Sequence, residues 1–105
     1  MIVMEEFKLM KRTAFLINVA RAPIVDRDAL YTALYNGTIA GAAFDVFWEE
    51  PANPHDRVLQ LDIFVLTPHI AGWTRESANV AADVITKNIE KVAQGEAPLT
   101  AVNSF

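Results

Sequence analysis

The segment AFLINVA (residues 14–20) decides the fold, together with two later runs of the same kind, AGAAFDVF (40–47) and IFVLT (63–67). None of the three alternates cleanly between apolar and polar residues. Short continuous apolar runs bounded by Pro, Gly or charged residues are typical of strands buried on both faces of a parallel sheet. We therefore predict parallel strands at about 14–20, 40–47 and 63–67.

Helical patterns separate and follow these runs. Asp26 can cap a helix that stops at Asn36-Gly37, and Thr74 can cap a long helix over about 75–94. We expect the Ala-rich face of the long helix, from 78 to 92, to be core. A helical fragment is expected over 4–10. This order of elements predicts an α/β fold, a partial Rossmann-like three-layer architecture with crossover helices.

Composition limits the function classes. The chain has 105 residues, which suffices for one domain, and its 52% hydrophobic and 21% charged residues exclude a disordered tail. A net charge of -4 without a Lys/Arg cluster argues against nucleic acid as a partner. No run of ~18 uncharged apolar residues is present, so no membrane partner is expected. The absence of cysteine excludes disulfides and thiolate metal sites, and we expect no metal site. The N-terminus does not resemble a signal peptide, so we expect a cytoplasmic protein.

Charged residues follow each predicted strand. Arg21 follows the first strand, Asp45 and Glu50 lie near and just beyond the end of the second, and His69 follows the third. In an open parallel sheet ligands bind at the carboxyl ends of the strands, so these side chains are expected to converge. There an Arg can hold a carboxylate, a His can transfer a proton, and a carboxylate can orient the imidazole.

Three segments carry a resemblance to a known family: INVARAPIVDRDAL (17–30), GTIAGAAFDVFWEEP (37–51) and LTPHIAGWT (66–74). They resemble the signature segments of NAD-dependent D-2-hydroxyacid dehydrogenases, which include D-3-phosphoglycerate dehydrogenase, glyoxylate/hydroxypyruvate reductase and D-lactate dehydrogenase. The resemblance covers essentially the whole chain. It implies an oxidoreductase that transfers a hydride between NAD(H) and a small 2-hydroxy or 2-keto acid, with NADP not excluded. It also implies a homodimer for the full-length protein.

The resemblance also implies residue roles. Arg21 would bind the substrate, His69 would be the general acid/base, and Glu50 would pair with His69. Asp45 would bond the nicotinamide carboxamide. The full set of cofactor-binding residues implied by the resemblance is Val19, Ala20, Arg21, Asp45, His69, Ile70, Ala71 and Gly72.

Two departures from the family pattern matter. Ala22 stands where the family usually has Gly after the Arg, which is harmless only if its backbone keeps a negative φ. The only glycines are Gly37, Gly41, Gly72 and Gly95, so no G-x-G-x-x-G phosphate-binding motif exists here. We therefore expect residues 1–105 to be the second half of a dinucleotide-binding domain, without the phosphate-binding half or the substrate-lid domain, and nearly inactive alone.

The sequence is also compatible with other functions and other residue roles. The chain can belong to an NAD-sensing regulator of the same fold, or be a structural, self-associating fragment. Glu49 competes with Glu50 as the partner of His69, although the resemblance favours Glu50, whose spacing of five from Asp45 matches the family pattern. Trp73 can pack in the interior, or it can line a substrate pocket or an interface.

Overall fold

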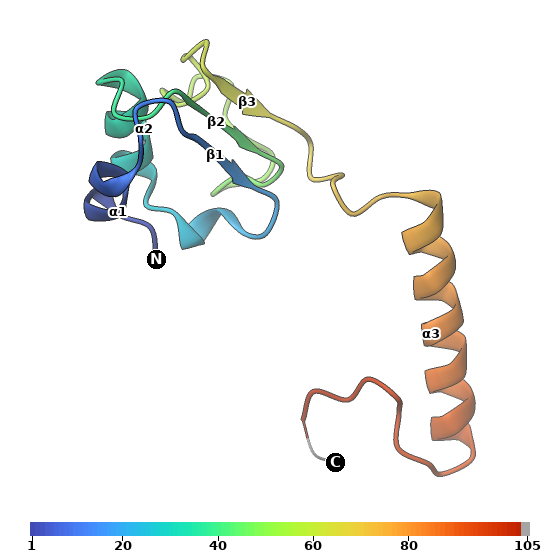
Figure 1. The fold of residues 1–105 in the computed structure, drawn as a ribbon. Coiled ribbons are helices and arrows are strands. Elements are labelled where there is room, and N and C mark those ends of the chain that lie inside the picture. The colour runs from blue at the N-terminus through green and yellow to red at the C-terminus, as the bar shows by residue number, and fades with distance from the viewer. Residues whose placement is uncertain (104–105) are drawn as a thin grey trace. The chain divides into compact units, whose positions relative to one another are not determined.

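The computed structural model describes residues 1–103, and the chain divides into two compact units, Met1–Ala71 and Gly72–Phe105. Figure 1 shows the first unit as a small sheet with helices and the second as one long helix followed by a tail. The helices and strands of the first unit are α1 (Met4–Leu9), β1 (Phe15–Asn18), the 3₁₀ turn Ala22–Ile24, α2 (Arg27–Tyr35), β2 (Gly41–Phe44) and β3 (Phe64–Leu66). The second unit contains α3 (Arg75–Ala93).

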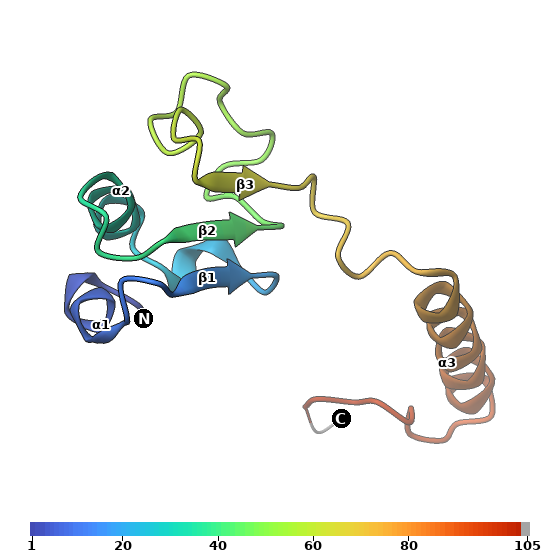
Figure 2. The same ribbon diagram turned by 45° about the horizontal axis from the view of Figure 1, so that its top comes forward.

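The three strands form one parallel sheet in the order β1-β2-β3, as predicted (Figure 2). Ile17 pairs with Ala43, and Phe44 pairs with Leu66. Each strand is shorter than its apolar run because the residues that follow it leave the ladder to form turns. The partial Rossmann-like α/β class is confirmed, and the carboxyl ends of all three strands lie at one edge of the sheet.

The two faces of the sheet differ. Leu16, Ala42, Phe44 and Phe64 belong to the apolar core that α1 and α2 complete from one side. On the other face Phe15 and Ile17 are each 70% exposed and Val65 is 56% exposed. The prediction of strands buried on both faces is therefore wrong for the described residues, since the helices of this unit cover only one face.

Helix α2 begins and ends as the sequence predicts. The Asp26 side chain accepts a hydrogen bond from the Ala29 N–H, which satisfies one of the free donors at the helix N-terminus. At the other end Gly37 adopts a positive φ of 64° and its N–H bonds to the Leu34 carbonyl. The helix buries Leu30 and its neighbours, which anchors the sheet from one side.

Helix α3 also has the predicted cap, because the Thr74 hydroxyl accepts the Ser77 N–H and the Ser77 hydroxyl accepts the Thr74 N–H. The expectation that its Ala-rich face is core is wrong: no residue of α3 is buried. Within residues 72–103 the second unit consists of one helix and a short tail. Asn88 holds the tail by accepting the Leu99 N–H and donating to the Thr100 hydroxyl, and these residues provide no other element against which the face could pack. Within residues 1–103, no helix combines the length and apolar character needed to cross a membrane.

Candidate active site

The residues singled out from the sequence follow the carboxyl ends of the three strands (Figure 2). Arg21 lies three residues after the end of β1, and Asp45 directly follows β2. Glu50 lies in the loop after β2, and His69 follows β3. The parallel register brings these loops to the same edge of the first unit, as expected for a ligand site in an open parallel sheet.

A buried asparagine shapes the turn that presents Arg21. Asn18, which is 4% exposed, accepts the Ala20 N–H through Oδ1 and donates through Nδ2 to the Arg21 carbonyl, both at 3.0 Å. The Arg21 side chain is exposed, and its Nη1 donates to the Ala20 carbonyl at 2.7 Å. The remaining guanidinium donors are available for an anion.

Ala22 does not disturb this turn. It is the first residue of the 3₁₀ turn, is 1% exposed, and does not adopt a positive φ. A methyl group is tolerated wherever the backbone stays at negative φ. The departure from Arg-Gly therefore leaves the backbone at Arg21 in an ordinary extended conformation, with φ -145° and ψ 136°.

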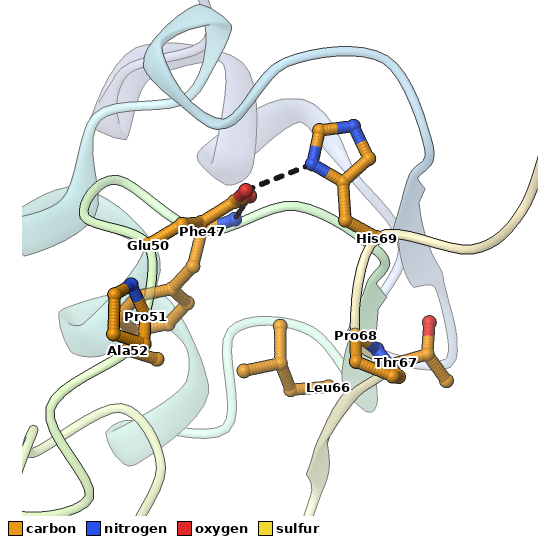
Figure 3. A pocket seen from close by; sticks show the side chains of 8 residues that line it. All are labelled: Phe47, Glu50, Pro51, Ala52, Leu66, Thr67, Pro68 and His69. Atoms are coloured by element: carbon orange, nitrogen blue, oxygen red, sulfur yellow. Dashed lines mark hydrogen bonds and ion pairs between the residues drawn. The ribbon is translucent and has the colours of Figure 1, made fainter.

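Glu50 and His69 form a hydrogen-bonded pair (Figure 3). His69 Nδ1 lies 2.8 Å from Glu50 Oε2, and the other carboxylate oxygen accepts the Phe47 N–H at 3.0 Å. An ionised carboxylate only accepts hydrogen bonds, so Nδ1 carries the proton and Nε2 is the nitrogen left for a reacting group. Of the two adjacent acids, the structure thus places Glu50, not Glu49, beside the imidazole.

The environment of Glu50 favours its charged form. The hydrogen bond from His69, followed by the Phe47 N–H, lowers the pKa of the Glu50 carboxyl below its ordinary value of 4.5. The positive charge of Arg21 acts in the same direction. A carboxylate that stays ionised is available to orient an imidazole through the neutral pH range.

His69 reaches Glu50 from an unusual backbone conformation. Its φ is 59°, and it is the one non-glycine residue with a positive φ among residues 1–103. The left-handed region costs an L-residue roughly 1–2 kcal/mol. Such a conformation persists only where the surrounding contacts hold it, and it is common at functional sites.

Asp45 is a buried carboxylate with three donors from its own chain. It is 4% exposed, and its oxygens accept the Thr67 hydroxyl, the Ile70 N–H at 3.0 Å and the Ala71 N–H at 2.7 Å. The Thr67 hydroxyl is the largest cause of a lowered pKa for Asp45, and the two backbone bonds act in the same direction. These hydrogen bonds offset the cost of burying a carboxylate at the end of an apolar run.

Two pockets lie at this edge of the sheet. One of about 350 Å³ has Glu50 and His69 among its lining residues, with Leu66, Pro51 and Pro68 supplying apolar wall (Figure 3). A second, also of about 350 Å³, lies on the open face of the sheet. Its lining includes four of the residues expected to bind the cofactor, namely Val19, Asp45, Ile70 and Ala71.

The other expected residues lie around these pockets or outside the first unit. Ala20 and Arg21 form the turn beside Val19, and Gly72 is the first residue of the second unit. Trp73, in the same unit as Gly72, is 84% exposed and does not pack in an interior.

Sequence reasoning missed two residues that shape the site, Asn18 and Thr67. Each lies at the end of a strand and forms side-chain hydrogen bonds there. Asn18 bonds to the backbone of the turn at Arg21, and Thr67 bonds to the Asp45 carboxylate. The available signal was a polar residue inside or at the end of an otherwise apolar run. Asn18 is buried and therefore needs a hydrogen-bond partner, and the turn beside it is the nearest source.

Known proteins resemble this chain in sequence. Residues 1–71 match the family model described as D-isomer specific 2-hydroxyacid dehydrogenase, NAD binding domain. A glyoxylate reductase of Thermofilum pendens is 46% identical over 99 residues, and one of Pyrococcus furiosus is 47% identical over 103 residues. The matches cover 94% and 98% of this chain but 29% and 30% of those relatives, so the chain spans less than a third of their length.

Solved structures of 2-hydroxyacid dehydrogenases and reductases also resemble this chain. The NADPH-dependent glyoxylate/hydroxypyruvate reductase of Sinorhizobium meliloti, in complex with NADP and malonate, superposes with a TM-score of 0.84 at 36% identity. That match covers 96% of this chain and 31% of the reductase. A 2-hydroxyacid dehydrogenase of Ketogulonicigenium vulgare superposes with a TM-score of 0.85 at 31% identity, covering 98% of this chain and 32% of that one.

Proposed function

The chain belongs to the D-isomer specific 2-hydroxyacid dehydrogenase family, within its NAD-binding domain, and we propose that its protein reduces a small 2-keto acid to the D-2-hydroxy acid with NADH. In this proposal His69 is the general acid/base, Glu50 orients it, and Arg21 binds the substrate carboxylate. The observation that carries the proposal is the His69–Glu50 hydrogen bond of 2.8 Å at the strand-end edge of the sheet.

The proton is handled by His69. Its Nδ1–H bonds to Glu50, so Nε2 faces the substrate and gives its proton to the carbonyl oxygen as the carbon accepts a hydride. In the oxidising direction neutral Nε2 takes the proton back from the hydroxyl group. Glu50 stabilises the protonated ring by its negative charge and fixes which nitrogen reacts.

Arg21 supplies the positive charge of the site. Its exposed guanidinium lies on the turn after β1, and its charge reaches far enough to lower the pKa of Glu50. A guanidinium binds a carboxylate through two parallel hydrogen bonds, which fixes the substrate as well as attracting it. Arg21 also stabilises negative charge on the carbonyl oxygen before the proton arrives.

In this proposal the nicotinamide ring occupies the pocket on the open sheet face. It offers apolar wall from Val19, Ile70 and Ala71 and a single carboxylate, Asp45. A carboxylate has about four acceptor positions, and Asp45 uses three of them within the chain. In this proposal the remaining position accepts the N–H of the ring carboxamide. NADH, when bound there, supplies the hydride.

Glyoxylate is the first substrate to test, because the curated relatives named above are glyoxylate reductases. The experiment measures NADH and NADPH oxidation by the complete gene product with glyoxylate, hydroxypyruvate and pyruvate, together with the chirality of the product where it has a stereocentre. We expect turnover with at least one of these acids and a D product. Cofactor binding without any turnover would instead favour a regulator of the same fold.

A further inference from the structure

The backbone N–H, the backbone carbonyl and the hydroxyl of Thr67 all form hydrogen bonds at the turn that carries His69. Its N–H donates to the Phe44 carbonyl at 2.9 Å, directly after the last residue pair of β2 and β3, Phe44 and Leu66. Its carbonyl accepts the His69 N–H at 3.0 Å, and its hydroxyl donates to Asp45 Oδ1. Thr67 is thus tied to the sheet, to the imidazole-bearing residue and to the buried carboxylate at once.

The chain then returns to the same carboxylate. After the left-handed conformation of His69, the Ile70 N–H bonds to Asp45 Oδ1 and the Ala71 N–H bonds to Oδ2. The carboxylate is therefore held by donors from both sides of His69, which is the residue with the positive φ. We call these four residues, Asp45, Thr67, Ile70 and Ala71, the Asp45 clamp.

The Asp45 clamp accounts for the strained residue at its centre. A positive φ at a histidine is unfavourable for the isolated chain, so bonds on both flanks must hold it. The two backbone donors can bond to separate oxygens only while the carboxylate keeps its orientation. Thr67 is the one side-chain donor in the clamp, and its bond to Oδ1 sets that orientation. The sheet bond of Thr67 in turn fixes the hydroxyl.

We infer, on the basis of the function proposed above, that Thr67 is a positioning residue. Its bond to Asp45 holds the backbone of His69 in the left-handed conformation from which the imidazole forms its hydrogen bond with Glu50. This role differs from cofactor binding by Asp45, because it acts on the imidazole through the backbone. Thr67 is among the lining residues of both pockets, but the role inferred for it is exerted through hydrogen bonds within the chain.

The test compares Thr67→Val, which keeps the shape but removes the hydroxyl, with Thr67→Ser, which keeps the hydroxyl. In the complete protein we expect Thr67→Val to lower kcat about tenfold or more, as expected for a misplaced proton donor. Thr67→Ser is expected to retain most of kcat. A loss of kcat equal in the two variants, or absent from both, would contradict the role of the hydroxyl.

A second readout does not depend on activity. NMR of ¹³C-labelled Glu50 reports the pKa of its carboxyl, which the bond to His69 holds below 4.5, and backbone couplings report the sign of φ at His69. Thr67→Val is expected to raise the pKa of Glu50 toward 4.5 and to shift φ, while Thr67→Ser leaves both unchanged. If the protein reduces no 2-keto acid, the proposed function fails while this readout still decides the positioning role.

If Thr67→Val does not fold, NMR of the wild-type protein tests the hydrogen bonds of the Asp45 clamp instead. The Ile70 and Ala71 amide protons are expected to shift with the same pH midpoint as the Asp45 carboxyl. The Thr67 hydroxyl proton is expected to exchange slowly enough to be seen. Amides that ignore the Asp45 titration, or a Thr67 hydroxyl in free exchange with water, would overturn the proposal.

Discussion

His69 Nδ1 lies 2.8 Å from Glu50 Oε2, although the two residues are 19 positions apart and belong to the loops after different strands. The pair forms because β2 and β3 run parallel and end at the same edge of the sheet. The second oxygen of Glu50 is held by the Phe47 N–H, so the carboxylate is fixed before any substrate arrives. This is the arrangement that a proton donor of defined orientation requires.

Removing the charge of Glu50 is expected to impair catalysis and to leave the fold intact. Glu50→Gln keeps a hydrogen-bond acceptor but no longer stabilises the protonated imidazole, so we expect kcat/KM for the 2-keto acid to fall about 10- to 100-fold. Glu49→Gln is the matched control, because Glu49 is the adjacent exposed acid. Steady-state kinetics of both variants measure the effect, and equal losses in the two would remove the specific role of Glu50.

The guanidinium of Arg21 is expected to act mainly on substrate binding. Arg21→Lys retains the charge but loses the two parallel donors, so we expect the KM for the 2-keto acid to rise about tenfold or more, since a bidentate site does not accept Lys as an equivalent. The KM for NADH is expected to change less than twofold. Arg12→Lys, at an exposed position before β1, is the control. A KM that stays at the wild-type value would place the substrate carboxylate elsewhere.

Restoring the usual glycine at position 22 is expected to destabilise the protein slightly without improving catalysis. Ala22 is buried in a 3₁₀ turn at negative φ, so Ala22→Gly adds freedom to the unfolded chain and removes a packed methyl group. We expect the free energy of unfolding in urea to fall by about 0.5–1 kcal/mol and the KM of the substrate to stay constant. A lower KM in the variant would show that the alanine distorts the turn at Arg21.

The stability of the fold is expected to fall in acid. The hydrogen bonds of Asp45 and Glu50 lower the pKa of each carboxyl below its ordinary value, 3.8 and 4.5 respectively. A lowered pKa contributes stability that is complete above the ordinary value and is lost as the pH falls through the lowered one. Urea midpoints between pH 6 and pH 3 are therefore expected to decline below about pH 4.5. Asp45→Asn is expected to decline less steeply than wild type between pH 4 and 3.

The sequence allowed the sheet and both helix caps to be predicted from local patterns, whereas the Glu50–His69 pair was expected from the resemblance to the family. The apolar runs are continuous, Asp26 and Thr74 have the side chains that cap helices, and parallel strands bring their ends together. Apolar character alone extended the predicted strands too far, since Val19 and Ala20 belong to the turn that Asn18 organises.

Other features could not be predicted from local patterns. The sequence of α3 shows that the helix has an apolar face, but it does not show whether another surface covers that face. In the structure of residues 1–103 no residue of α3 is buried. The left-handed backbone of His69 depends on donors from Thr67, Ile70 and Ala71 reaching one carboxylate. These hydrogen bonds join Asp45 to residues more than 20 positions away, and no short-range sequence pattern encodes them.

The most direct test of the central claim is turnover of His69→Gln in the complete protein, measured beside His55→Gln with glyoxylate and NADH. His55 is exposed in the loop between β2 and β3 and serves as the control for a lost imidazole. We predict that His69→Gln lowers kcat by about 10²- to 10⁴-fold, while its dissociation constant for NADH changes less than about threefold. Turnover of His69→Gln within a few fold of wild type would contradict the assignment of His69 as the proton donor.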